Sequence, residues 1–118
     1  MDSILTSIKK LLGIAADDTS FDADVMMHIN DTFATLNDLG VGPDEGFRIE
    51  DETSTWDEFL PVSNKNFNRL PTYVYLKVKI VFDPTLSSSV LAAHERRIAE
   101  LESRLTMTAE TSEGGVDA

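Results

Sequence analysis

The stretch that decides the fold of this 118-residue chain is LPTYVYLKVKIVF, residues 70–82. It fits a helix, because Leu70 and Val74 recur at helical spacing and Pro71 suits a first turn. The alternation of apolar and polar residues over 76–80, and the many β-branched and aromatic residues, instead favour a strand. The rest of the chain offers few strands, and a lone strand would leave its backbone hydrogen bonds without a partner. We therefore predict a buried central helix.

Three further helices are predicted before this stretch. Ser3–Leu12 carries its apolar residues on one face, as an amphipathic helix does. Asp22–Leu39 has an apolar stripe and acidic residues in its first turn, where the helix dipole favours negative charge. A glycine follows each of these segments and favours a helix end there. The residues Thr55-Trp56-Asp57-Glu58 fit a capping box, which predicts a short helix to about Leu60.

A last helix is predicted after Asp83-Pro84, from about Ser88 to Leu105, with serines as candidate N-caps. Four apolar residues and one histidine recur in it at spacings of three and four, which is typical of a heptad seam that packs on a partner helix. Residues 106–118 are rich in Thr, Ser, Glu and Gly and have little to bury, so we predict an extended tail. The candidate interface residues are Leu91, His94, Ile98, Leu101, Leu105, Thr106, Met107 and Val116.

These elements predict an all-α fold. Residues 1–105 are expected to form a small bundle of four or five helices with a long C-terminal helix, and residues 106–118 the extended C-terminal tail. The chain length is that of a single domain. The predicted core comprises Ile8, Leu11, Val25, Ile29, Phe33, Leu36, Val74 and Val78.

The charge of the chain is strongly negative and unevenly distributed. There are 21 Asp and Glu residues against 10 Lys and Arg, a net charge of −11. Between Ile14 and Phe59 lie thirteen acidic residues and a single basic residue, Arg48. Tight nucleic-acid binding depends on Lys and Arg, and anionic membranes also attract basic surfaces, so we expect neither as a partner. The sequence contains no signal peptide and no apolar run of membrane-spanning length.

The residue types that carry most enzyme chemistry are scarce or unsuitably spaced. The chain has no cysteine and two histidines, which provides neither a thiolate nor a zinc-binding pattern. The acidic residues of 17–24 lack the central glycine and distal glutamate of a calcium loop. Gly40–Pro43 is followed by Asp44 and Glu45, which would repel a phosphate. We therefore expect no catalytic residue, no metal ion and no cofactor, and interpret Trp56 and Phe59 as core residues.

The order of five short segments resembles a known family. They are ILTSIKKLLGI (4–14), FDADV (21–25), LGVGP (39–43), YVYLKVK (73–79) and ELESRL (100–105). In this order they resemble the head–tail connector (adaptor) proteins of long-tailed bacteriophages, over about Ile4 to Leu105. The family pattern also places residues 70–82 in a helix. No single segment is catalytic, so the resemblance implies a structural protein rather than an enzyme.

The resemblance implies an all-helical subunit of a ring, usually of twelve copies, in the neck of the virion. Such a ring lies beneath the portal protein, extends the DNA channel and docks the next neck or tail-completion protein, after assembly in the host cytoplasm. In related proteins the C-terminal segment binds the portal. This chain departs from the family pattern in residues 44–54 and in its tail.

An acidic ring would let DNA slide through its channel, because like charges repel. The candidate channel-lining residues are Asp44, Glu45, Glu50, Asp51 and Glu52. A ring also requires two different surfaces on each subunit, since its interface is heterologous. The alternative function from the sequence is a small acidic regulatory protein that binds a basic partner or mimics DNA.

Overall fold

Residues 70–82 form a helix in the computed structural model of the chain, which describes residues 3–43, 45–59, 69–83 and 85–117, with side chains up to residue 107. The helices are α1 (Ile4–Leu12), α2 (Asp22–Asp38), α3 (Trp56–Phe59), α4 (Leu70–Phe82) and α5 (Ser88–Asp117). Within the described residues there is no strand, and the only β-type pairing is an isolated bridge between Ser3 and Thr55. The predicted all-α bundle is thus confirmed.

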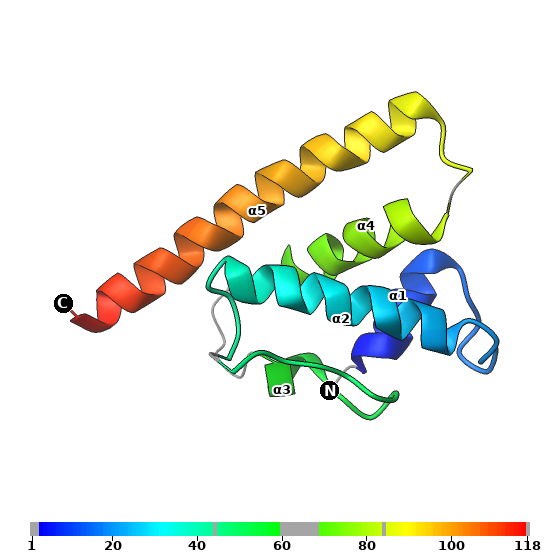
Figure 1. Cartoon of the computed structure of the whole chain (residues 1–118), viewed down its shortest axis with the longest axis horizontal. Helices are drawn as coiled ribbons and strands as arrows, with labels where there is room; N and C mark the ends of the chain where they lie inside the picture. The colour runs from blue at the N-terminus through cyan, green and yellow to red at the C-terminus, as the bar shows by residue number, and fades with distance from the viewer. Residues whose placement is uncertain (1–2, 44, 60–68, 84, 118) are drawn as a thin grey trace.

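Helix α4 lies at the centre of the bundle and packs against α1, α2 and α5 (Figure 1). The side chains of Leu70, Tyr73, Val74, Leu76 and Val78 are buried. A helix satisfies its own backbone hydrogen bonds, so it can be surrounded by other helices without a strand partner. This explains why the helical interpretation holds although the residues of this stretch favour a strand.

Helix α1 is capped at both ends, and the glycine at its C-terminal end is the one that its sequence predicts. The hydroxyl of Ser3 accepts a hydrogen bond from the backbone N–H of Thr6 at 3.2 Å. Gly13 follows the helix with φ 83°, the left-handed conformation that glycine adopts without strain. One core assignment is wrong, because Leu11 is 49% exposed whereas the other seven predicted core residues are buried. Leu11 instead borders an open hollow that Trp56 of α3 and Pro71 of α4 also line.

The segment between α2 and α3 has no regular structure but is fixed at defined points. The side-chain amide of Asn30 on α2 accepts a hydrogen bond from the N–H of Ile49 at 2.7 Å and donates one to its C=O at 2.9 Å. Gly42 lies against the ring of Phe59, where a Cβ would come within 2.5 Å of a ring carbon. The predicted capping box is present, since the N–H of Thr55 donates to Glu58 Oε1 at 2.9 Å.

Helix α5 is longer than predicted. It begins after Ser87, whose hydroxyl accepts a hydrogen bond from the N–H of Val90, and it continues past Leu105 to Asp117 (Figure 1). The prediction of an extended conformation for the tail is therefore wrong for residues 106–117. Once a helix exists, each further residue adds a hydrogen bond without a new nucleation step. The distal part of α5 projects away from the other helices in Figure 1.

Candidate protein-interaction surfaces

The predicted heptad seam on α5 is largely used within the chain. Ile98, Leu101 and Leu105 are at most 6% exposed and belong to the same hydrophobic core as α4. Tyr73 on α4 donates a hydrogen bond from its hydroxyl to Glu102 Oε2 at 2.7 Å, which joins the two helices beside this seam. Burial and the neighbouring carboxylate both raise the pKa of Tyr73, so it stays protonated and remains a donor.

The other candidate interface residues have different positions. Leu91 and His94 are partly exposed near the start of α5, Thr106 is partly exposed, and Met107 is 62% exposed. Val116 lies in the part of α5 whose side chains the structure does not describe. A partner can therefore reach four of the eight predicted residues, whereas Ile98, Leu101 and Leu105 are not available to it. The heptad spacing did predict a partner helix, but that helix is α4 of the same chain.

The outward side of α5 forms a second surface. Val90, Ala93, Arg97, Glu100, Arg104 and Met107 follow one another at spacings of three and four and are all exposed. We call these six residues the α5 ridge. Arg97 is paired with Glu100, and Arg104 Nε lies 3.6 Å from the same carboxylate. Arg96, also exposed, lies beside the ridge, which therefore carries an excess of positive charge.

A groove runs along α2, between this helix and the segment 45–50. It consists of two adjoining hollows of about 700 and about 450 Å³, both open to solvent, which share Asn30, Ala34 and Arg48. Asp31 and Asp38 lie on its α2 side, and Glu45 and Glu50 on its other side. We call this hollow the α2 groove. Its rim is acidic apart from Arg48, so a basic or positively rimmed partner suits it.

The acidic candidate channel residues are on the surface, as far as the structure describes them. Glu45, Glu50, Asp51 and Glu52 are exposed, whereas Asp44 lies outside the described residues. The hydroxyl and the N–H of Thr53 both bond the carboxylate of Asp51 and hold its pKa below the ordinary value. This carboxylate therefore keeps its negative charge in mildly acidic solution.

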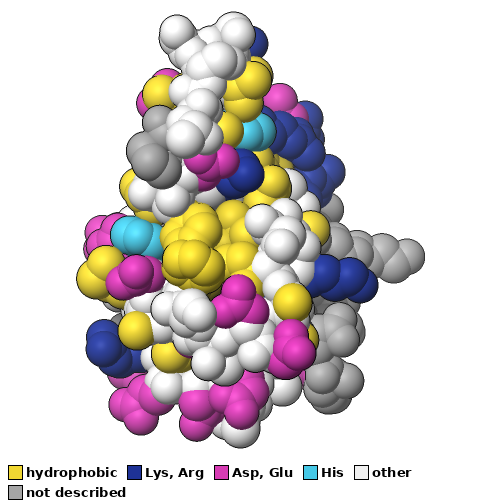
Figure 2. Space-filling model, turned by 90° about the vertical axis from the view of Figure 1, so that its right-hand side faces the viewer, with side chains coloured by type: hydrophobic (Ala, Val, Ile, Leu, Met, Phe, Trp, Pro, Cys, Tyr) yellow, Lys and Arg dark blue, Asp and Glu magenta, His cyan; other side chains and the backbone are white. Residues whose placement is uncertain are grey.

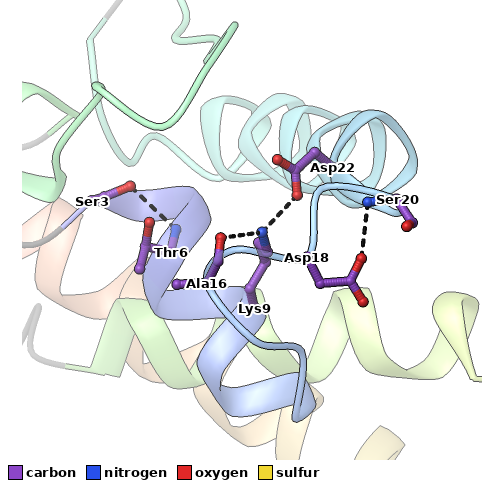
Figure 3. Close-up of polar contacts among 7 residues, drawn as sticks. All are labelled: Ser3, Thr6, Lys9, Ala16, Asp18, Ser20 and Asp22. Atoms are coloured by element: carbon purple, nitrogen blue, oxygen red, sulfur yellow. Dashed lines mark hydrogen bonds and ion pairs between the residues drawn. The ribbon is translucent and has the colours of Figure 1, made fainter.

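A buried lysine shapes the acidic turn between α1 and α2 (Figure 3). Lys9 is almost fully buried, and its Nζ lies 2.8 Å from Asp22 Oδ1 in an ion pair that lacks hydrogen-bond geometry. The same Nζ donates a hydrogen bond to the C=O of Ala16 at 3.1 Å. The carboxylate of Asp22, in the first turn of α2, thus binds Lys9, and α2 has no side-chain cap at its start. This contact fixes the start of α2 relative to α1.

An exposed apolar area at one end of the molecule was not predicted. Figure 2 shows hydrophobic side chains gathered on the face where α2 begins and α4 ends, bordered by acidic side chains and also by a histidine and basic side chains. On this side Phe21 and Phe82 meet edge to face, with ring centroids 5.6 Å apart, and Phe21 is 43% exposed. The sequence places Phe21 before a helix as a hydrophobic staple, and nothing in its local pattern indicates Phe82 as its neighbour.

The described residues contain no cluster of side chains suited to binding a metal ion. No group of three or more His, Asp, Glu or Cys side chains among them could hold a metal ion. His28 on α2 and His94 on α5 are both partly exposed and on different helices. No helix in the described part of the chain is long and apolar enough to cross a membrane. The prominent features of the surface are thus charged and apolar areas of the kind that bind proteins.

Comparison with known protein families identifies the family of the chain. A family model described as phage connector protein matches residues 4–112. The chain belongs to the phage connector family. The match covers all five helices, including the first part of the α5 extension. Searches of curated proteins and of solved structures found no match.

Membership of this family gives the connector its general role. It is a structural protein of the junction between the head and the tail of a bacteriophage, and its family is not a family of enzymes. Such a protein contacts neighbours on the head side and on the tail side. The α5 ridge, the α2 groove, the apolar face with Phe21 and the distal part of α5 are the candidate surfaces for these contacts.

Proposed function

We propose that this connector forms a closed ring, of twelve copies, beneath the portal protein in the neck of the virion. The ring extends the DNA channel and docks the next neck or tail-completion protein, and it assembles in the host cytoplasm. The observation that carries this proposal is the match of the connector family over residues 4–112. That match favours a connector over the other function considered from the sequence, a small acidic regulatory protein that binds a basic partner or mimics DNA.

The proposed contact with the portal is made by the distal part of α5. Residues 106–117 continue the helix beyond Leu105, the last core residue among the side chains that the structure describes. A helix of this length, about 18 Å at 1.5 Å per residue, can reach a protein that lies above the ring. Its few apolar residues, Met107 among them, are too few to stabilise the monomer by burial.

The proposed channel is lined with carboxylates. Asp51 and Glu52 lie at the exposed turn of the segment between α2 and α3, and neither has a basic partner among the described residues. A lumen of this charge keeps phosphates at a distance and does not hold the DNA. In an image of the assembled neck, a lumen lined by Lys and Arg with phosphates against them would contradict this part of the proposal.

The experiment that tests the function uses heads that contain the portal but lack the connector. The full-length chain should bind to them as a ring, visible by negative-stain electron microscopy. A chain truncated after Leu105 should fold with the same melting temperature but bind these heads poorly. Two results would contradict the proposal: no ring from the full-length chain, or binding of the truncated chain equal to that of the full-length chain.

A further inference from the structure

Two surfaces of this connector match one another in length, spacing and charge. The α5 ridge extends over residues 90–107, about 25 Å of helix, and the α2 groove follows residues 23–38, about 22 Å. Ala23, Met27, Asn30, Ala34 and Asn37 line the groove at spacings of four and three, which is also the spacing of the ridge. Two helices with this repeat can interdigitate along their length.

The charges of the two surfaces are opposite. The groove presents Asp31, Asp38, Glu45 and Glu50 against the single basic residue Arg48. The ridge presents Arg97 and Arg104 against Glu100, and Arg96 stands exposed beside it. An interface that joins these surfaces brings arginines to an acidic rim, whereas two grooves or two ridges repel one another.

Both surfaces also expose apolar side chains that the monomer does not cover. Six large hydrophobic side chains are exposed in the described part of the chain, and three of them lie on these two surfaces. Met27 in the groove is 59% exposed, and Val90 and Met107 stand near the two ends of the ridge, 41% and 62% exposed. Methionine adapts its shape to a partner, and small residues such as Ala34 allow a helix to approach closely.

The two surfaces lie on different sides of the molecule. Helix α4 lies between α2 and α5, and the segment 45–50 lies on the far side of α2 from α5 (Figure 1). One subunit therefore cannot place its own ridge in its own groove. The same ridge and groove can join neighbouring copies head to tail, which is the heterologous contact that closes a ring.

We propose that the α5 ridge of one copy of this connector docks into the α2 groove of the next copy. This inference rests on the proposed ring and names the two surfaces that join its subunits. It assigns Glu45 and Glu50 to the contact between subunits and leaves Asp51 and Glu52 for the channel. The ridge contact uses the first two-thirds of α5 and ends at Met107, so Met107 belongs to the contact between subunits and residues 108–117 remain available for the portal.

Charge reversal tests the pairing. The groove variant is Asp31→Lys/Asp38→Lys, and the ridge variant is Arg96→Glu/Arg97→Glu; all four residues are exposed in the monomer. Each variant alone should lose at least about tenfold in assembled ring, measured by native mass spectrometry or as occupied rings on portal-containing heads. The control Asp17→Lys/Asp57→Lys makes the same change of charge as the groove variant, outside both surfaces, and should assemble as the wild type does.

Mixing the two variants makes the test specific. In the mixture, the reversed ridge of one variant meets the reversed groove of the other, and the remaining ridge and groove also carry opposite charges. Equal amounts should therefore form rings in which the two variants alternate, with the two masses present in equal numbers. The four substitutions combined in one chain should restore the ring as well.

The results separate this inference from the proposed function. A wild-type chain that forms rings while either folded variant also forms them would overturn the ridge-and-groove contact and leave the connector ring intact. Failure of the mixture to assemble would do the same. If the groove variant keeps its rings but no longer binds the portal, the groove contacts the portal and not the ridge of the next copy. A wild-type chain that forms no ring, alone or on the heads, overturns both proposals together.

A crosslinking experiment provides an independent arm, because the chain has no cysteine of its own. Ala34 in the groove and Ala93 on the ridge are small and exposed, so both can be replaced by cysteine. With a short bismaleimide, Ala34→Cys/Ala93→Cys should give a ladder of covalent oligomers up to the full ring. The control Ala34→Cys/Thr19→Cys should still form the ring but give no covalent oligomer on a denaturing gel, and a test variant that forms rings without giving a ladder would overturn the contact.

Discussion

The two parts of helix α5 form one continuous helix but differ in what stabilises them. Between Ser88 and Leu105 the helix places Ile98, Leu101 and Leu105 in the core and is joined to α4 by the bond from Tyr73 to Glu102. Beyond Leu105 no residue with a described side chain is buried. Most of the stability of a helix in a protein comes from packing, so the first part contributes to folding and the second projects from the fold. One continuous helix can thus stabilise the fold with its first part and extend outward from the fold with its second part.

The sharpest test of this difference is the substitution Leu101→Ala. Leu101 is fully buried, so its truncation should lower the free energy of unfolding by about 2–5 kcal/mol, through lost burial and a cavity. The matched substitution in the second part, Met107→Ala, should change it by less than about 0.5 kcal/mol. Urea unfolding of both variants measures the difference. Similar losses at the two positions would show that both parts belong to the core.

The hydrogen bond between α4 and α5 should give a smaller effect. Tyr73→Phe removes the donor to Glu102 and should lower the free energy of unfolding by about 1–2 kcal/mol, since the bond is to a charged acceptor. Glu102→Gln keeps an oxygen acceptor for the same hydroxyl and should cost less. An equal loss in both variants would mean that the charge of Glu102, rather than the bond, links the helices.

The smallest effect on stability is expected from removing the second part altogether. Truncation after Leu105 should change the free energy of unfolding by less than about 0.5 kcal/mol, because no described side chain beyond it is in the core. In the full-length monomer the amides of residues 106–117 should exchange with deuterium much faster than those of residues 95–105. Equal protection of both parts would contradict the distinction drawn between them.

The sequence predicts most of the helices well because they have local causes. Ser3, the capping box at Thr55 and the spacing of apolar residues act within a few positions, and the structure contains all of them. The helical form of residues 70–82 required a different argument, the lack of any partner strand. The end of α5 was missed because the composition of the tail indicates weak burial and says little about whether a helix already formed will continue.

The candidate surfaces were harder to predict, for a physical reason. A heptad spacing indicates that one face of a helix packs against another helix, but it does not say whether that helix belongs to the same chain. Here the helix that packs against α5 at Leu101 is α4 of the same chain. The α2 groove depends on Asn30 and Ile49, which are 19 residues apart, and no periodic pattern relates them. The spacing of Ala23, Met27, Asn30 and Ala34 is visible in the sequence once the exposed side of α2 is known.

The two fixed points of the segment between α2 and α3 have a consequence for how this protein can diverge. Gly42 beneath the ring of Phe59 admits no side chain, and Asn30 holds Ile49 by its backbone, a contact that does not depend on the residue type at position 49. The exposed positions between and beyond them, such as Glu45, Glu50 and Asp51, contribute little to the core. Natural variation can therefore change the charge of this segment, together with that of the surface it contacts, while the helical scaffold stays the same. A phage that acquires a different neighbour at its neck can adapt here by substitutions that leave folding untouched.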